Sequence, residues 1–138
     1  MIRPFHEDDT EAVVALWEES GLTRPWNDPR KDIARKLGVQ REWFLVVEDE
    51  GQVVASVMAG YDGHRGWVNY LAVTPSHRGR GLARALMTEV ERLLGDAGCP
   101  KVNLQVRTTN EAALGFYERL GYKRDDAISL GRRLEHDS

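Results

Sequence analysis

The most constraining feature of the sequence is a strand–helix–strand segment between Trp67 and Val106. Residues 67–73 are rich in β-branched and aromatic side chains, residues 79–97 carry apolar side chains at helical spacing, and residues 102–106 alternate between apolar and polar. A helix between two strands of one sheet must cross over, which makes the strands parallel and the connection right-handed. The start of that helix therefore lies beside the carboxyl end of the first strand, where α/β units often bind ligands.

The residues around this segment predict further strands and helices of one α+β domain. Expected strands lie at residues 2–5, 43–48, 52–61 and 128–134, and expected helices lie around residues 12–17, from residue 29 to about 37, and from 111 to 120. Asp28 followed by Pro29 is a typical helix start. The 138 residues fit a single domain spanning 1–138, with a mixed sheet at its centre.

Composition and charge exclude several classes of protein. The longest apolar runs, such as Phe44–Val47 and Val53–Ala59, are far shorter than the roughly 20 residues of a membrane-spanning helix. The amino terminus lacks the basic and then apolar order of a signal peptide, so we expect a cytoplasmic protein without membrane contact. A net charge of −3 disfavours nucleic-acid binding, which depends on a basic surface.

Cysteine and histidine usage argues against disulfides and metal sites. The one cysteine, Cys99, forms no disulfide within the chain and excludes a multi-cysteine zinc site. No Cys-His arrangement surrounds it, and Gly-Cys-Pro at a helix end indicates a small buried residue. The four histidines lack the spacing of metal ligands, so we expect no metal; they are His6, His64, His77 and His136.

A glycine-rich turn, Arg78–Ala83, opens the long helix and carries a specific chemical signal. Two glycines allow the backbone to approach a ligand closely, and the first N–H groups of a helix have no partner within it. The helix dipole and the side chains of Arg78, Arg80 and Arg84 add positive charge, so the turn suits a phosphate or pyrophosphate. The alternative is a plain turn with solvated arginines. A P-loop is excluded because no Gly-Lys-Ser/Thr follows.

Two motifs resemble the signatures of the GNAT superfamily of acyl-CoA-dependent N-acetyltransferases. Arg78-x-x-Gly81-x-Ala83 is similar to the pyrophosphate motif Q/R-x-x-G-x-G/A of that family. Asn110–Tyr122 resembles its second signature, N-x-x-A-x-x-x-Y-x-x-x-G-F/Y, one strand further along the chain. Three other segments resemble the bacterial YpeA-like acetyltransferases, namely Gly60–Gly66, Arg24–Pro29 and Leu130–Leu134. The resemblance covers almost the whole chain in the order of its elements.

This resemblance implies a fold and an activity. The fold is a central mixed, mostly antiparallel sheet of about six to seven strands with about four helices, splayed between the fourth and fifth strands. The activity is that of an acyltransferase that moves acetyl from acetyl-CoA to a primary amine by direct attack in a ternary complex, without a metal. In the family the pantetheine arm of acetyl-CoA lies between the splayed strands, much as a peptide adds to a sheet edge.

Carried over residue by residue, the resemblance places coenzyme contacts on two stretches of backbone. Backbone groups of Leu71, Ala72 and Val73 hold the pantetheine arm. Backbone N–H groups of the glycine-rich turn hold the pyrophosphate; the turn comprises Arg78, Gly79, Arg80, Gly81, Leu82 and Ala83. Asn110 contacts the coenzyme beside the arm, and it equally suits the capping position of a helix.

The resemblance assigns catalytic roles to two residues, and the chemistry of amide formation explains what each role requires. The attacking amine must be neutral, the developing oxyanion needs a donor, and the departing thiolate needs a proton. The backbone N–H of Leu71 corresponds to the donor for the thioester oxygen. Tyr117 corresponds to the general acid near the sulfur, although Ala113, Tyr117 and Leu120 share one helix face and also fit a packed core.

Candidates for the acceptor side come from two loops. Trp26 and Asn27 fall where the first two helices of the family are joined over the acceptor site, with packing of Trp26 into the core as the alternative. Asp62 and His64 lie in a Gly-bounded turn and equally suit ordinary turn chemistry. The candidates for a general base are Glu42, Glu48, Asp62 and His64, and no motif decides among them.

Two alternatives to this enzyme stay open. A domain of the same fold could bind acyl-CoA without turnover, as a sensor or interaction module, although Tyr117 argues for catalysis. A phosphate-binding domain of another class is the second, and the missing Lys-Ser/Thr after Gly81 opposes it. The acceptor is open between a small amine, a peptide N-terminus and a protein lysine. Both a monomer and a homodimer are compatible with the sequence.

Overall fold

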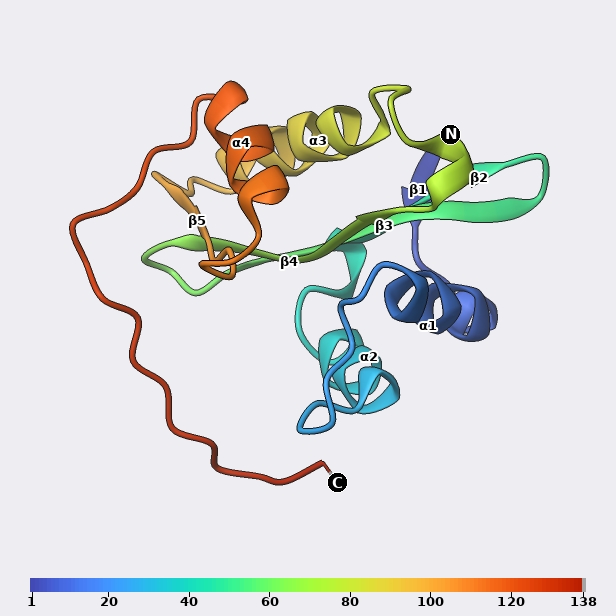
Figure 1. Cartoon of the computed structure of the whole chain (residues 1–138), viewed down its shortest axis with the longest axis horizontal. Coiled ribbons are helices and arrows are strands. Elements are labelled where there is room, and N and C mark those ends of the chain that lie inside the picture. The colour runs from blue at the N-terminus through green and yellow to red at the C-terminus, as the bar shows by residue number, and fades with distance from the viewer. Residues whose placement is uncertain (138) are drawn as a thin grey trace.

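The computed structural model, which describes residues 1–137, contains a five-stranded mixed sheet between two layers of helices (Figure 1). The strands lie side by side in chain order: β1 (Ile2–Pro4), β2 (Phe44–Asp49), β3 (Gln52–Tyr61), β4 (Gly66–Val73) and β5 (Val102–Leu104). β1 to β4 pair antiparallel, whereas β5 runs parallel to β4. The predicted α+β class and the predicted crossover between β4 and β5 are confirmed.

The helices divide between the two faces of the sheet. They are α1 (Thr10–Glu19), α2 (Pro29–Leu37), α3 (Leu82–Asp96) and α4 (Glu111–Arg119). α3 and α4 cover one face, and α1 and α2 lie on the other (Figure 1). The predicted start of α2 is confirmed, because the Asp28 carboxylate accepts the Arg30 N–H at 2.9 Å. None of the helices in residues 1–137 has the length and apolar character needed to cross a membrane.

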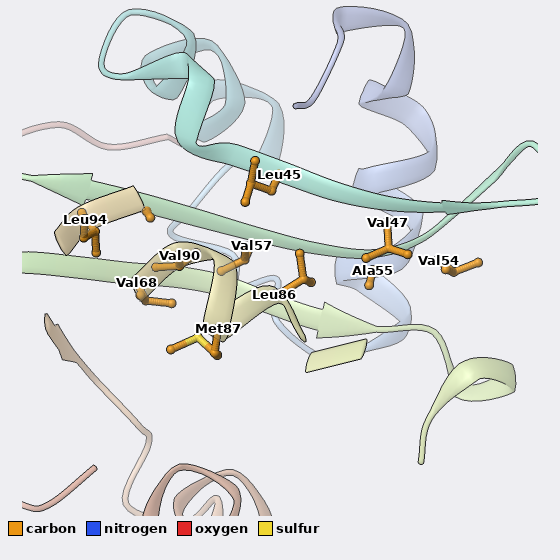
Figure 2. Close-up of a cluster of buried hydrophobic side chains, with 11 residues drawn as sticks. Leu45, Val47, Val54, Ala55, Val57, Val68, Leu86, Met87, Val90 and Leu94 are labelled. Atoms are coloured by element: carbon orange, nitrogen blue, oxygen red, sulfur yellow. The ribbon is translucent and has the colours of Figure 1, made fainter. Parts of the chain in front are cut away.

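Both faces of the sheet are buried, and alternate side chains of the strands serve two cores. In β2, Leu45 belongs to the core shared with α3, and Phe44 belongs to the core shared with α1. Four residues on one face of α3 form its buried stripe, and Figure 2 shows them packed against the strands: Leu86, Met87, Val90 and Leu94. The helical spacing that predicted this helix therefore also identified its buried face.

Trp17 of α1 anchors the second core and is fully buried. Its indole stacks on Phe44 of β2 at a ring-centroid distance of 6.2 Å and on Tyr70 of β4 at 3.8 Å. Phe5 also stacks on Phe44, at a ring-centroid distance of 4.2 Å. These stacked rings fix α1 over the middle strands of the sheet.

The ladder between β4 and β5 is short and ends in mid-strand. Its register pairs are Gly66 with Val102, Trp67 with Asn103, and Val68 with Leu104. The two strands have no further pairs beyond Val68 and Leu104, so they separate towards their carboxyl ends. The predicted splay between the fourth and fifth strands is confirmed, and it leaves one backbone edge of β4 unpaired from Asn69 to Val73.

The predicted count of six to seven strands is wrong, because the described sheet has five. Residues 128–134, expected to form the last strand, adopt no helix or strand. The apolar side chains of this segment are each at least 88% exposed: Ile128, Leu130 and Leu134. The segment runs outside the body towards α2 (Figure 1), where Asp137 bonds the Arg35 guanidinium at 2.6 Å. A strand needs backbone partners, which the described residues do not provide along this path.

A partly buried ion-pair cluster ties β1 to β2 and to the start of α1. Arg3 donates to both carboxylate oxygens of Asp9, at 2.8 and 2.9 Å, and to Glu48 at 2.8 Å. The Asp9 carboxylate also accepts the His6 N–H at 2.8 Å. These bonds hold the pKa of Asp9 below its ordinary value, and the bond from Arg3 contributes most. The pair between Arg3 and Asp9 therefore stabilises the fold only while Asp9 is ionised.

We predict that Asp9→Asn lowers the free energy of unfolding by about 2 kcal/mol at pH 7, because a charge-assisted pair is lost. Since the pKa of Asp9 is lowered in the folded state, the wild-type advantage is present above the ordinary value of 3.8 and disappears as the pH falls through the folded-state pKa. Urea denaturation at several pH values measures both effects.

The control for this variant is Glu7→Gln, which alters an exposed carboxylate 3.9 Å from Arg41. An exposed pair of this kind contributes less than about 0.5 kcal/mol, so the control stays close to wild type. A stability loss in Asp9→Asn that does not diminish at low pH contradicts the ionic origin of the effect.

Candidate functional site

β4 contains a bulge directly beyond its last pair with β5. Its register with β3 shifts between Ser56 and Met58, where β4 has one residue more than its partner. Tyr70 has a φ of +56°, in the left-handed region that residues other than glycine rarely adopt. Neither Tyr70 nor Leu71 has a register partner on β3 or β5. Strained backbone of this kind gathers at functional sites.

The bulge also changes which face the side chains of β4 occupy. Val68 belongs to the core shared with α3, whereas Tyr70 and Ala72 pack with the core shared with α1. Leu71 and Val73 pack against the α3 side. In a regular strand, residues 68, 70 and 72 would share one face. The extra residue therefore reverses the alternation of side chains along β4 and directs Leu71 towards the side on which α3 begins.

The turn between β4 and α3 presents backbone N–H groups to solvent. Gly79 and Gly81 have φ values of +80° and +79°, and the whole of Arg78–Gly81 is exposed. α3 begins at Leu82 with Gly81 at its N-cap, without a side-chain cap bond and without an acidic residue in its first turn. Its first N–H groups are therefore accessible to an external anion, which the helix dipole also favours.

Three arginines lie in this turn or directly after it. Arg78 donates from Nε to the backbone carbonyl of Val73 at 3.1 Å, which ties the turn to the end of β4. Arg80 and Arg84 are exposed and lie on either side of the N-cap in the sequence. The structure thus brings the predicted anion site and the unpaired edge of β4 together.

Asn110 caps α4. Its side-chain Oδ1 accepts the Ala113 N–H at 3.0 Å, so the predicted capping role is confirmed. The cap uses the amide oxygen, and the NH₂ group is a separate donor. A contact of that group with a coenzyme stays a prediction.

Tyr117 is half-buried on α4 among other aromatic side chains. Its ring meets Phe116 edge-on at 5.1 Å and Tyr122 at 5.8 Å. Burial raises the pKa of Tyr117 to about 12, so the phenol stays protonated at neutral pH. Tyr117 and Leu71 pack against the same buried cluster on the α3 side. The two predicted catalytic residues therefore lie on one side of the sheet.

A groove of about 1060 Å³ lies between β5, α4 and the segment that follows α4. Tyr117 forms part of its wall, together with residues 102–108 on the strand side. Ligand sites commonly have volumes of roughly 300–1,000 Å³. Tyr117 therefore borders a space of the size that a ligand needs, but neither Leu71 nor the turn Arg78–Ala83 lines this groove.

Trp26 and Asn27 lie in the loop between α1 and α2. The Trp26 side chain is 48% exposed, so its alternative role as a core residue is rejected. Asn27 donates to the Asp32 carboxylate at 3.1 Å and accepts from Arg133 at 2.9 Å. Asp32 also accepts the Tyr70 hydroxyl at 2.6 Å. A chain of hydrogen bonds thus links this loop to the bulge of β4, and a substrate contact of the loop stays a prediction.

Asp62 and His64 lie in the turn before β4, away from the bulge. The Asp62 carboxylate accepts the N–H groups of Arg65 and His64 at 2.7 and 2.8 Å, and these bonds lower its pKa. The extended chain from Gly66 to Leu71 spans roughly 17 Å at ordinary strand rise. The structure gives Asp62 a role in the turn and does not bring it or His64 to Leu71. A substrate contact at this distance stays a prediction.

The other polar candidates have structural partners or lie apart. Glu48 accepts from Arg3 at 2.8 and 3.0 Å, and Glu42 lies in the short turn before β2. Cys99 is half-buried, and its Sγ lies 3.3 Å from the Lys101 carbonyl oxygen. Within residues 1–137, no group of three or more His, Cys, Asp or Glu side chains could hold a metal ion.

Tyr70 is a site residue that the motifs do not identify. Its strained backbone and its bond to Asp32 place it beside Leu71, at the centre of the arrangement. The signal for the bulge is the change of face between Val68 and Tyr70. Because both side chains are apolar enough for either face, the sequence pattern alone does not reveal that change.

Comparison with known proteins assigns a family to this arrangement. Residues 6–122 match the profile described as the Acetyltransferase (GNAT) family. An acetyltransferase of Pectobacterium atrosepticum is 54% identical over 136 residues, which cover 99% of this chain and 96% of the relative. An acetyltransferase of Yersinia pestis is 54% identical over 133 residues, which cover 96% of this chain and 94% of the relative.

Solved structures show the same fold. Ard1 from Thermoplasma volcanium superposes with a TM-score of 0.77 at 29% identity, over 88% of this chain and 80% of that protein. A predicted acetyltransferase from Clostridium acetobutylicum, crystallised with acetyl-CoA, gives a TM-score of 0.75 at 15% identity, over 100% of this chain and 99% of that protein. At this identity the second likeness concerns the fold alone.

We predict opposite effects of adding a methyl group to two glycines, one at the start of α3 and one inside it. Gly81→Ala forces a side chain into a φ of +79° and lowers the free energy of unfolding by about 1 kcal/mol. Gly95→Ala improves helix propensity and raises that free energy by about 0.5–1 kcal/mol. Neither added carbon meets an atom within 4 Å, so backbone conformation alone sets the difference.

Urea denaturation of both variants measures these free energies. A neutral Gly81→Ala shows that the turn relaxes to another conformation, and a destabilising Gly95→Ala shows that α3 is crowded at this position. Either result contradicts the prediction.

Proposed function

Because the chain belongs to the acetyltransferase (GNAT) family, we propose that it transfers acetyl from acetyl-CoA to a primary amine by direct attack in a ternary complex. The observation that carries this proposal is the bulge at Tyr70 and Leu71, beside an unpaired strand edge and directly before the glycine-rich turn. Acetyl transfer needs an oxyanion donor, a cleft for the thioester arm and a site for the diphosphate. The bulge lies within the unpaired edge of β4, and the turn follows that edge along the chain.

In this proposal the diphosphate binds at Arg78–Ala83. The N–H groups at the start of α3 donate to its oxygens, and Arg80 and Arg84 balance its charge. The pantetheine arm lies along the unpaired edge from Val73 to Leu71 and pairs its amides with the backbone, as an added strand does. Arg78 already bonds the Val73 carbonyl, so the arm uses the second lone pair of that oxygen or replaces the bond.

Leu71 and Tyr117 carry the proposed chemistry. The neutral amine attacks the thioester carbonyl carbon, and the carbonyl oxygen, now negative, accepts the Leu71 N–H. The tetrahedral intermediate then expels the thiolate, which takes the phenolic proton of Tyr117. The proton lost from the attacking nitrogen returns to the phenol through water. A pKa of about 12 keeps Tyr117 protonated until the thiolate forms.

The acceptor enters, in this proposal, beside the loop that carries Trp26 and Asn27. The exposed Trp26 indole offers an apolar surface, and it offers a cation–π contact to the ammonium form of the acceptor before that group loses its proton. Asp62 and His64 contact the acceptor only if it extends along β4, because they precede Gly66 and the strand from Gly66 to Leu71 alone spans roughly 17 Å. A small amine, a peptide N-terminus and a protein lysine are the acceptor classes to be tested.

The alternative is a domain that binds acyl-CoA without turnover. Both functions need the glycine-rich turn and the strand edge, but only catalysis needs a protonated phenol at Tyr117. The presence of a tyrosine at position 117, where the family has its general acid, therefore favours the enzyme. A cytoplasmic location and a monomeric or homodimeric state stay predictions.

We predict that acetyl-CoA at about 100 times its dissociation constant stabilises the protein by about 2.7 kcal/mol, because only the folded state binds it. For a domain of this size the melting temperature then rises by about 8 °C. Thermal denaturation with acetyl-CoA, CoA and ATP measures the specificity of this effect. CoA is expected to stabilise similarly and ATP far less. Stabilisation by ATP alone would overturn the assignment.

We predict that Tyr117→Phe lowers kcat by about 10²-fold, in the range that a general acid contributes, and leaves acetyl-CoA affinity nearly unchanged. Release of free CoA over a panel of amines first identifies an acceptor, and the variant is then measured at saturating acceptor. Tyr122→Phe is the matched control, because it removes a neighbouring hydroxyl that bonds Glu91 at 2.5 Å. Equal turnover of wild type and Tyr117→Phe removes Tyr117 from the mechanism.

A further inference from the structure

A buried chain of hydrogen bonds ends on the backbone of the bulge. The indole Nε1–H of Trp17 donates to Ser56 Oγ at 2.8 Å. The Ser56 hydroxyl donates to the backbone carbonyl of Tyr70 at 2.9 Å. The chain therefore runs from α1 through β3 to β4 and stops at the peptide group that joins Tyr70 to Leu71.

Packing alone does not account for a serine at this position. Ser56 and Trp17 are both 0% exposed, and Ser56 is flanked in β3 by buried apolar residues. A buried hydroxyl loses its hydration, so an alanine would fill the place without that cost unless the hydrogen bonds serve a purpose. The partners of Ser56 indicate the purpose, because one of them is the carbonyl of the strained residue.

The geometry of the peptide group fixes the direction of the Leu71 N–H. No peptide bond within residues 1–137 is cis, and in a trans peptide the carbonyl and the following N–H point in opposite directions. Because the Tyr70 carbonyl points to Ser56 on β3, the Leu71 N–H points away from β3. On that side β4 has lost its pairing with β5.

Two further contacts hold Tyr70 in its unusual conformation. Its ring stacks on Trp17 at 3.8 Å with an interplanar angle of 13°, and its hydroxyl donates to Asp32 at 2.6 Å. Trp17 thus makes two contacts: its ring stacks on Tyr70, and its indole N–H donates to Ser56. The peptide between Tyr70 and Leu71 is held by its own carbonyl and by the side chain that precedes it.

We propose that Ser56 and Trp17 are positioning residues that orient the Leu71 N–H as the oxyanion donor; this inference rests on the proposed acetyl transfer. The hydrogen bond to the Tyr70 carbonyl also polarises the shared peptide, which makes its N–H a stronger donor. Neither side chain touches the substrate. Both act through the main chain at the reacting end of the cleft.

The test is the kcat of Ser56→Ala with acetyl-CoA and the acceptor found in the amine panel. The expected result is a fall of about 10-fold, the size of one hydrogen bond lost from the transition state. The KM for acetyl-CoA stays within about 2-fold, because the pantetheine and diphosphate contacts are intact. Trp17→Phe keeps a stacked ring but removes the N–H, and it gives a smaller fall in kcat. This variant also serves if Ser56→Ala does not fold.

Val13→Ala is the control for general destabilisation. Val13 is fully buried one helical turn before Trp17 in the same core, and it makes no hydrogen bond to the bulge. Its variant lowers the melting temperature but leaves kcat near wild type. An unchanged kcat in both Ser56→Ala and Trp17→Phe overturns the inference, and so does an equal fall in Val13→Ala.

Amide NMR provides a readout that does not depend on turnover. In Ser56→Ala the Leu71 amide proton loses the polarising bond on its peptide and moves upfield, whereas in Val13→Ala it stays in place. A wild-type protein that transfers acetyl to no amine contradicts the proposed function, and the Leu71 resonance still decides whether Ser56 controls this peptide. A resonance that does not move in Ser56→Ala overturns the inference.

Discussion

β4 loses its neighbour on one side at Val68, and the rest of the strand must find other partners for its backbone. A main-chain group left unpaired inside a fold costs free energy, so such an edge persists only where something else meets it. Arg78 meets the Val73 carbonyl, and Ser56 meets the Tyr70 carbonyl. In our proposal acetyl-CoA meets the remaining groups. The early end of one ladder thus leaves an unpaired edge on β4, and in our proposal that edge binds the ligand.

The two faces of the sheet contribute differently to the site. On one face, α3 supplies the first N–H groups for an anion, and its buried stripe fixes the helix on the strands. On the other face, α1 holds Trp17 against Tyr70 and Ser56, directly below the bulge. In our proposal the peptide between Tyr70 and Leu71 therefore lies between an anion site and a rigid aromatic support. Because these parts come from different layers, neither layer alone would form the site.

Much of the fold follows from the sequence, because helical spacing and glycine positions act locally. The buried stripe of α3 and the N-cap at Asp28 are examples. The bulge is different: strict alternation would place Val68 and Tyr70 on one face, and only the pairing of β3 with β4 separates them. The expected strand at 128–134 failed for a related reason, since its apolar alternation is real but no strand pairs with it. The role of Leu71 is predicted only through a family resemblance, because its side chain carries no chemical signal.

In our proposal the oxyanion donor is a backbone N–H group, so no particular side chain at position 71 is needed to supply it. Nearly every amino acid at position 71 carries the same N–H, and only proline would delete it. The side chain there can therefore drift through evolution, or be varied in the laboratory, without removal of the donor. Selection would act instead on the neighbours that hold the peptide between Tyr70 and Leu71 in place, such as Tyr70 itself, which has a φ of +56°. If our proposal holds, an inactive descendant of this protein need not show any change at position 71.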